Sequence, residues 1–300
     1  MKVNKSYSNP KGGTEILFDG LSSKIDVSNV NFILSKCDLS LIDPNRINIF
    51  WCHVSYDQEA IANLYNEYGQ RFLEQCDAIV FVSHWQHDQF RKRINFPGSK
   101  CYVIPNCINP ATVHIKPKDI KLIYTSMPWR GLSVLCEAYS LMKHKVPLTV
   151  VSGTKIYGKE FHKHNDKIFR KLYNKLKKIG ITRFDYLPNI EVCKLLEDHH
   201  ILAYPSIFEE TSCLSAIEAL SYGLKVVTTN YGALPETCSV FADYVPLGEE
   251  KEFTIRYAKA LDNAVENYYY NNYQVEFYKK YYSWEARIPE WEKLIQKLKK

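Results

Sequence analysis

Short apolar runs alternate with longer amphipathic stretches along almost the whole chain of 300 residues. The runs are rich in β-branched and aromatic side chains, and the stretches between them place apolar residues at helical spacing. This alternation predicts an α/β fold built from βαβ units with parallel sheets. The predicted strands cover residues 30–34, 47–52, 78–82, 102–104, 121–124, 148–151, 184–187, 201–204, 225–228 and 241–245.

The predicted helices fill the gaps between these strands. They cover residues 14–21, 58–75, 86–93, 131–142, 163–179, 190–198, 212–222, 252–266, 274–282 and 284–299. Two successive series of such units make two Rossmann-like sheets with a cleft between them. Because ligands of these folds bind at the carboxyl ends of parallel strands, functional residues are expected where the strands end.

A stretch with little periodic pattern and three prolines, residues 105–119, is the predicted linker. It separates an N-terminal Rossmann-like domain (1–112) from a second Rossmann-like domain (113–275). The helices at 276–300 are expected to pack back toward the first domain. Residues 1–11 contain no apolar run, so the first strand is expected to be missing, very short or lost through the choice of start codon.

The length of the apolar runs and the spacing of the cysteines bear on the cellular compartment of the protein. No run approaches the ~20 apolar residues of a membrane span, and the first five residues lack the apolar core of a signal peptide. The nine cysteines are odd in number, scattered and free of any Cys-x-x-Cys pair, so neither disulfides nor a zinc site is expected. These features predict a cytoplasmic protein.

The net charge of +6 is modest and permits anionic ligands such as nucleotide phosphates. A Lys-rich helix at 163–178 keeps its apolar residues on one face, so its lysines are interpreted as a solvated surface. The basic C-terminus, 293–300, is short, and at most a weak peripheral membrane contact is expected from it. The Tyr- and Asn-rich stretch at 267–282 is interpreted as compositional bias, and no nucleic-acid partner is expected.

The most informative stretch covers residues 204–236, where a strand end, two acids and a helix start follow one another. Glu209 and Glu210 lie in the loop after the strand. Thr211 or Ser212 is predicted to cap the helix that comes next, because hydroxyl side chains are preferred at that position. The loop and the helix start are therefore expected to face the cleft together.

The start of this helix is a predicted anion site. The free N–H groups of Ser212, Cys213 and Leu214 suit a diphosphate, as helix N-termini do. Glu218 lies two turns further on, and a rise of ~1.5 Å per residue places it roughly 10 Å from Glu210. That separation matches a hexose and a ribose joined by a diphosphate, with one carboxylate for each sugar. The alternative is a capped amphipathic helix with two solvated acids.

The same stretch resembles the signature of glycosyltransferase family 4, retaining enzymes with the GT-B fold. Glu210 and Glu218 match the Glu-x7-Glu spacing of the family. The Pro-Ser pair at 205–206 and the Gly-Ala-Leu-Pro-Glu turn at 232–236 match the elements before and after it. At 211–214, Thr-Ser-Cys-Leu replaces the Gly-Phe-Gly-Leu of many members, which makes the identity of the donor less transferable.

Further elements resemble the family in the same order along the chain. Arg130 and Gly131 are similar to its Lys-Gly element, where a cation at a helix start stabilises a pyrophosphate leaving group. Ser126 lies in the turn that usually offers another phosphate contact. Gly12 and Gly13 resemble the Gly-Gly turn near the N-terminus of members, which touches the donor phosphates. The alternatives are a surface ion pair for the arginine and a plain tight turn for the glycines.

A histidine, His53, directly follows the predicted strand at 47–52. In the family, a histidine at a comparable strand end contacts the donor sugar or the acceptor. The resemblance therefore implies a site role for His53, and the alternative is a structural histidine.

The resemblance implies a retaining, hexosyltransferase-like enzyme of carbohydrate biosynthesis. It would move a sugar from a nucleotide-diphosphate sugar to a hydroxyl of a glycan, lipid or protein glycan. The domain at 1–112 would form the acceptor side, and the domain at 113–275 would bind the nucleotide sugar. Glu210, His53 and Arg130 are the expected catalytic residues, and Glu218 would orient the ribose. No Asp-x-Asp follows a predicted strand, so neither a metal nor another cofactor is expected. The alternatives are a non-catalytic nucleotide-sugar- or glycan-binding protein and a nucleotide-sugar epimerase of the same fold.

Overall fold

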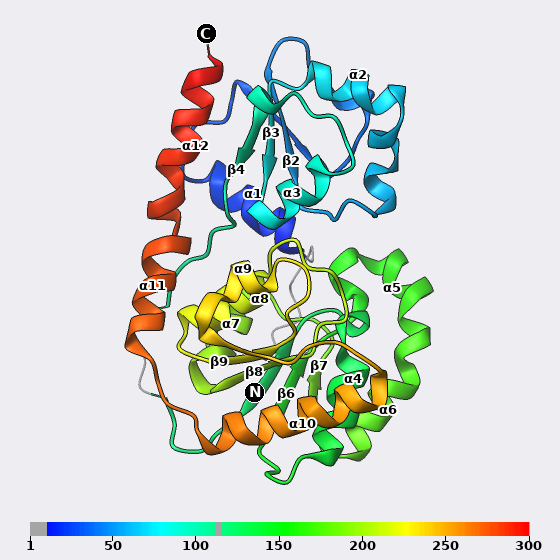
Figure 1. The fold of residues 1–300 in the computed structure, drawn as a ribbon, viewed down its shortest axis with the longest axis vertical. Helices are drawn as coiled ribbons and strands as arrows, with labels where there is room; N and C mark the ends of the chain where they lie inside the picture. The colour runs from blue at the N-terminus through cyan, green and yellow to red at the C-terminus, as the bar shows by residue number, and fades with distance from the viewer. Residues whose placement is uncertain (1–10, 112–115, 300) are drawn as a thin grey trace.

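The computed structural model describes residues 11–111 and 116–299, and it contains two parallel β-sheets, one in each half of the chain (Figure 1). The predicted α/β architecture with parallel sheets is confirmed. The first sheet has four strands in the order β1 (Val30–Leu34), β2 (Ile47–Cys52), β3 (Ala78–Phe81) and β4 (Cys101–Val103). Its strands therefore lie side by side in the order in which the chain makes them.

The first sheet is covered on both faces, because alternate residues of each strand point to opposite sides. Ile49 and Trp51 pack with α1 on one face, and Phe50 packs with η2, α2 and α3 on the other. The helices of this half are α1 (Gly13–Ser22), η1 (Leu39–Leu41), η2 (Glu59–Tyr65), α2 (Glu67–Gln75), α3 (His84–Arg91) and η3 (Gly98–Lys100).

The second sheet has six parallel strands in the order β10-β9-β8-β5-β6-β7. The chain starts at the centre with β5, adds β6 and β7 on one side, and then returns to add β8, β9 and β10 on the other. The order reverses between β5 and β8, which is where doubly wound sheets bind their ligands. The strands are β5 (Leu122–Thr125), β6 (Leu148–Val151), β7 (Thr182–Phe184), β8 (Ile201–Tyr204), β9 (Lys225–Thr228) and β10 (Ala242–Tyr244).

Helices cover both faces of the second sheet and bury a core of aliphatic and tyrosine side chains (Figure 1). Tyr257 is one of these core residues, and its hydroxyl donates to the backbone oxygen of Val227 at 2.7 Å. The helices are η4 (Pro128–Arg130), α4 (Leu132–Leu141), η5 (Thr154–Tyr157), α5 (Lys159–Asn165), η6 (Asp166–Phe169), α6 (Arg170–Lys178), α7 (Asn189–Asp198), α8 (Leu214–Ser221), α9 (Leu234–Cys238), η7 (Ser239–Phe241), α10 (Glu250–Glu266) and α11 (Asn272–Tyr282).

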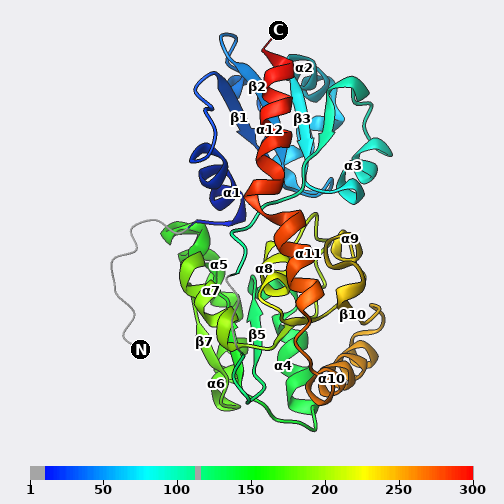
Figure 2. The ribbon, with the colours of Figure 1, turned by 90° about the vertical axis from the view of Figure 1, so that its left-hand side faces the viewer.

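The last helix, α12 (Trp284–Leu298), returns from the second half to the first (Figure 2). Ser283 caps it by accepting a hydrogen bond from the backbone N–H of Ala286. Trp284 and Trp291 are buried in the core of the first sheet. The two ends of the described chain, α1 and α12, thus complete the same face of this sheet.

Several elements differ from the sequence predictions, and in one of them a local side chain interrupts the predicted helix. The predicted helix at 58–75 is divided because the side chain of Asn66 accepts the N–H of Gly69 and starts α2 anew. The predicted helix at 163–179 is divided into α5, η6 and α6, and α9 was not predicted.

Two sequence predictions fall wholly or partly outside the described residues. They are the missing first strand, predicted for residues 1–11, and the domain boundary at 112–113. None of the helices in the described ranges is both long and apolar enough to cross a membrane.

Candidate active site

A cavity of about 460 Å³ lies between the two halves, at the carboxyl ends of β2, β5 and β8. Both halves contribute to its walls, and its deepest polar groups come from the point where the strand order of the second sheet reverses. The cavity brings together every residue for which the sequence predicts a site role: Gly12, Gly13, His53, Ser126, Arg130, Glu210, Ser212, Cys213, Leu214 and Glu218.

Glu210 is held in the loop after β8 and is 2% exposed. The Nη1 atom of Arg130 donates to both carboxylate oxygens of Glu210, at 2.9 and 3.1 Å. The hydroxyl of Tyr204, the last residue of β8, donates to Oε1 of the same carboxylate. A buried carboxylate needs such partners, because an uncompensated buried charge is strongly unfavourable.

Arg130 reaches Glu210 from η4, the turn after β5, and a quarter of its side chain is exposed. Its guanidinium also lies over the ring of Phe208, 4.3 Å from the centroid. Burial disfavours the charge of Arg130, but the carboxylate of Glu210 outweighs this and raises the pKa of the arginine. A permanent cation is therefore fixed at the cavity wall by a buried anion.

The turn that carries Arg130 depends on Gly131, which has φ +112°. A Cβ atom there would lie 2.0 Å from the backbone oxygen of Pro205, so only glycine fits. The turns after β5 and β8 are thus pressed together at the reversal of the strand order. Ser215 strengthens this junction by donating to the backbone oxygen of Thr125.

Helix α8 begins at Leu214, two residues later than predicted, and its N-cap residue is Cys213, whose side chain makes no capping hydrogen bond. The prediction that Thr211 or Ser212 caps this helix is wrong. The hydroxyl of Thr211 instead donates to the backbone oxygen of His53 at 2.9 Å, because the loop turns it toward the first half. The first N–H groups of α8 therefore have no side-chain cap at the cavity wall.

Glu218 lies on α8, half-buried, and its Oε1 accepts a hydrogen bond from Nδ2 of Asn189 at 2.6 Å. Burial raises the pKa of Glu218 to about 7. The roughly 10 Å separation predicted between Glu210 and Glu218 assumed helical rise throughout. That assumption is wrong, because Glu210 lies four residues before the helix begins.

His53 lies just beyond β2, and its backbone is fixed from two sides. Its N–H donates to the hydroxyl of Ser35 at 2.9 Å, and its oxygen accepts the hydroxyl of Thr211. Within the described residues, neither ring nitrogen has a hydrogen-bond partner. Burial lowers the pKa of His53 to about 3, so the imidazole is neutral and presents one donor and one acceptor.

The predicted glycine turn lies at the start of α1. Gly12 is the N-cap residue of this helix, and a Cβ on Gly13 would lie 2.9 Å from Cδ1 of Leu214. The N-terminus of α1 thus approaches the N-terminus of α8 across the cavity. On the second half, Ser126 donates to the hydroxyl of Tyr204 at 3.3 Å.

Two more contacts join the halves beside the cavity. The hydroxyl of Ser83 donates to the backbone oxygen of Thr211 at 2.6 Å. Both carboxylate oxygens of Glu236 accept N–H groups at the start of α3, from His84 at 2.8 Å and Trp85 at 2.7 Å. A carboxylate at a helix N-terminus is favourable there. Together with the Thr211–His53 bond, these contacts hold the halves together around the cavity.

Sequence reasoning missed Asn189 and Asn106 of the cavity wall and also Tyr204, which lies fully buried behind that wall against Glu210. Tyr204 had a signal, since it is the last residue of a strand that ends in the cleft. Asn189 had none, because its pairing with Glu218 depends on the packing of α7 against α8. Asn106 lies buried in the linker, and its Oδ1 has no hydrogen-bond partner among the described residues.

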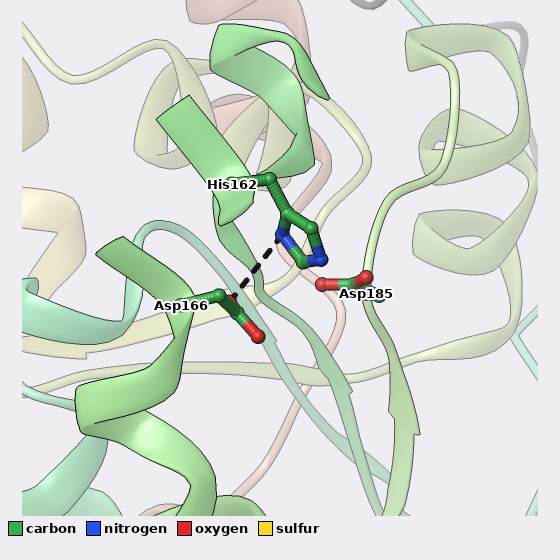
Figure 3. Close-up of side chains that lie close together, drawn as sticks. All are labelled: His162, Asp166 and Asp185. Carbon is green, nitrogen blue, oxygen red and sulfur yellow. Dashed lines mark ion pairs between the residues drawn. The ribbon is translucent and has the colours of Figure 1, made fainter. Parts of the chain in front are cut away.

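The described part of the chain contains one group of three potential metal ligands, formed by His162, Asp166 and Asp185 (Figure 3). Asp185, at the cavity wall, forms an ion pair with Lys155 at 2.7 Å. Asp166 accepts the hydroxyl of Thr154 at 2.9 Å. Because these carboxylates already have cationic or hydroxyl partners, the cluster differs from an open metal site.

Comparison with protein families matches residues 41–112 to Glycosyltransferase Family 4 and residues 120–263 to Glycosyl transferases group 1. A search of curated proteins found no match. Among solved structures, a glycosyltransferase from Rickettsia africae has a TM-score of 0.66 at 16% identity, and the match covers 100% of this chain and 85% of that one. Sucrose-phosphate synthase from Thermosynechococcus elongatus has a TM-score of 0.66 at 16% identity, with 85% and 68% covered.

A third similar structure is the pneumococcal O-GlcNAc transferase in complex with UDP and GlcNAc, with a TM-score of 0.65 at 14% identity, covering 99% of this chain and 64% of that one. The two sheets, the cavity between them and these similarities define a glycosyltransferase with the GT-B fold. The chain belongs to glycosyltransferase family 4, as the sequence motifs predicted.

Proposed function

We propose that the protein is a retaining, metal-independent glycosyltransferase of EC class 2.4. It transfers a hexose-like sugar from a nucleotide-diphosphate sugar to a hydroxyl of a glycan, lipid or protein glycan. The observation that carries this proposal is the pairing of Arg130 with Glu210 on the wall of a cavity that also holds the N-terminus of α8 and Glu218. The pneumococcal relative, in complex with UDP and GlcNAc, supports a donor of this class.

Each donor group has a complementary partner in this arrangement. The diphosphate lies at the N–H groups of residues 212–214, which lead into α8 and include its first residue, within reach of Arg130. The ribose hydroxyls donate to Glu218. Glu210 faces the transferred sugar, where its negative charge stabilises positive charge at the anomeric carbon.

In the proposed reaction, the acceptor hydroxyl attacks the anomeric carbon on the face from which the diphosphate leaves. The bond from that carbon to the phosphate oxygen breaks, and the same oxygen takes the proton of the acceptor hydroxyl. The new glycosidic bond keeps the configuration of the donor. His53 is neutral and has free hydrogen-bonding capacity, so it can orient a sugar or acceptor hydroxyl without taking a charge.

Metal independence rests on the charges already present. Arg130 and the α8 N-terminus supply positive potential where the leaving group gains negative charge. A function in carbohydrate biosynthesis and a cytoplasmic location complete the proposal.

The test begins with a thermal-shift screen of nucleotide sugars on the full chain. A donor at about 100 times its dissociation constant should stabilise the protein by about 2.7 kcal/mol. With the donor identified, transfer to simple glycoside acceptors is measured with and without EDTA, and the anomeric configuration of the product is read by NMR. Inversion, or loss of activity in EDTA that magnesium restores, would contradict the proposal. Donor binding without transfer would favour a binding protein, and an epimerised free donor would favour an epimerase.

A further inference from the structure

The positive charge of this protein is concentrated in one segment. Residues 155–178, here called the basic segment, contain nine Lys and Arg residues and two Asp and Glu residues, a net charge of +7. The whole chain has a net charge of +6, so all other residues together carry a charge of −1. An ordinary solvated surface mixes both signs, and this segment does not.

Most of these cations have no acidic partner. Lys155 pairs with Asp185, and Lys175 pairs with Glu137. Among the described residues, no ion pair involves the other seven cations of the segment, which are Lys159, Lys163, Lys167, Arg170, Lys171, Lys177 and Lys178. All seven are exposed, so their charges act on whatever approaches this face.

Apolar side chains lie exposed among these cations. Ile168, at the corner between α5 and α6, is 74% exposed, Tyr157 is 51% exposed and Phe161 is 38% exposed. The rings of Tyr157 and Phe161 pack against each other and against Trp129, so they are held on a supported aromatic cluster. Exposed aliphatic and aromatic groups within a field of lysines are typical of segments that lie on an anionic lipid surface.

The basic segment also reaches the proposed active site. Ile156 and Tyr157, near its beginning, line the cavity. Helix α5 lies at the end of the second half that faces the first half, as both ribbon views show (Figures 1 and 2). A surface that binds this segment would therefore lie beside an entrance to the cavity.

We propose that the basic segment docks the protein on an anionic membrane surface and presents the cavity to a lipid-linked acceptor. The choice of a bilayer over a nucleic acid follows from Ile168, because an exposed aliphatic side chain gains by entering lipid and makes no hydrogen bond to a phosphate or to a base edge. The acceptor part of this proposal rests on the proposed function, whereas the docking part does not.

The test measures flotation of the full chain with vesicles of phosphatidylcholine alone and of phosphatidylcholine mixed with phosphatidylglycerol. The wild type should bind the anionic vesicles and lose this binding in high salt. The variant Lys163→Gln/Lys167→Gln/Lys171→Gln removes three exposed lysines spaced four residues apart. At ~1 kcal/mol per basic residue near the surface, its partitioning should fall by on the order of 100-fold.

A matched control, Lys92→Gln/Lys251→Gln/Lys280→Gln, removes the same charge from exposed lysines outside the segment and should bind nearly as the wild type does. Ile168→Ser keeps every charge and should lower partitioning by about tenfold, since it removes the exposed aliphatic group. Far-UV circular dichroism verifies that each variant is folded.

Equal binding to neutral and anionic vesicles, or an equal loss in the control variant, would overturn the proposal. Binding of a single-stranded oligonucleotide without binding of anionic vesicles would replace the membrane with a nucleic acid. Flotation needs neither donor nor acceptor, so it remains informative even if no transfer is found. If the wild type transfers sugar to a water-soluble acceptor, the triple variant should do so at an unchanged rate.

Discussion

The two sheets of this protein differ in how they are wound, and the cavity reflects that difference. The second sheet reverses its strand order between β5 and β8, and the turns after these two strands line the cavity together. The four described strands of the first sheet run in chain order without such a reversal. The second half therefore builds a binding crevice of its own, and the first half covers it with residues from α1 and from the end of β2.

The two walls of the cavity also differ in how their predicted site residues are hydrogen-bonded. On the second half, Glu210 is already held by Arg130 and Tyr204, and Glu218 by Asn189. Buried polar atoms without a hydrogen-bond partner among the described residues lie on both sides. They are the ring nitrogens of His53 on the first half, Oδ1 of Asn106 in the linker, and Nε of Arg130, Oγ of Ser152 and Oδ1 of Asp185 on the second half. In the proposed function the second-half wall is the donor wall, and its two carboxylates are preorganised by protein groups, whereas the imidazole of His53 on the facing, first-half wall has no such partner.

The largest expected effect is that of Glu210→Gln, which breaks the preorganised wall. The substitution keeps the size of the side chain but removes the charge that pairs with Arg130 and that, in the proposed function, faces the transferred sugar. Turnover should fall by about 100- to 1,000-fold, as when other preorganised electrostatic groups are removed. Release of nucleoside diphosphate measures the effect.

Glu209→Gln is the matched control, one residue earlier in the same loop, and its turnover should stay within a few-fold of the wild type. If both variants lose activity equally, the loss comes from the loop as a whole and the role given to Glu210 is wrong.

The pairing of Glu210 with Arg130 also marks the limit of sequence reasoning. Each of the two residues was predicted to line the site, because a residue at the end of a parallel strand faces the cleft whatever its neighbours are. Their contact was not predicted, since it joins residues 80 positions apart and depends on how closely the turns after β5 and β8 approach. The bond from Thr211 to His53, over 158 positions, was missed for the same reason.

Helix boundaries show the same division between local and tertiary causes. The start of α2 at Asn66 had a local signal, because asparagine is a favoured N-cap residue. Thr211 had an equally good local signal and yet caps nothing, since the first half offers its hydroxyl a different acceptor. Capping residues at a domain interface are therefore the least secure part of such a prediction.

The second prediction concerns the facing wall. His53→Ala removes a neutral ring with free donor and acceptor capacity, so the efficiency of transfer should fall by about tenfold. The dissociation constant of the donor should change little if His53 serves the acceptor. Calorimetry with the nucleotide sugar, beside steady-state kinetics with varied acceptor, separates the two effects. An exposed histidine away from the cavity, in His144→Ala, is the control. Weaker donor binding in His53→Ala alone would place His53 on the donor wall instead.

The third prediction concerns the joint between the halves. Thr211→Val keeps the shape of the side chain but removes the hydrogen bond to the backbone oxygen of His53. The loss of one such bond should raise KM for the acceptor by about two- to tenfold, because the first half is then held less firmly against the second half. Steady-state kinetics with varied acceptor provides the measurement.

Thr229→Val is the control for this joint, since Thr229 makes a bond of the same kind, at 2.8 Å to the backbone oxygen of Ser206, entirely within the second half. Both variants should lower the melting temperature, but only Thr211→Val should raise KM. A raised KM in both variants would show that KM for the acceptor depends on the stability of the fold in general rather than on the contact between the halves.

The smallest expected effect is a pH dependence of donor binding that arises in the second half alone. Burial raises the pKa of Glu218 from 4.5 to about 7, so the ligand-free protein holds a proton there in mildly acid solution. Because the folded pKa lies above the unfolded one, this proton stabilises the fold below about pH 4.5, and the contribution is lost as pH rises toward 7. Ribose hydroxyls donate more strongly to an ionised carboxylate than to a neutral carboxyl group, so donor affinity should increase by a few-fold from about pH 6 to about pH 8.

Calorimetry with the nucleotide sugar tests this dependence, since its diphosphate does not titrate in that range. His53, with a pKa lowered to about 3, remains neutral throughout. Glu218→Gln keeps an oxygen for Asn189 but cannot ionise, so its affinity should be weaker and independent of pH. If the variant retains the pH dependence, the titrating group lies elsewhere in the cavity. If donor affinity of the wild type does not depend on pH, Glu218 does not bind the ribose. Donor affinity would then come from Arg130 and the N-terminus of α8.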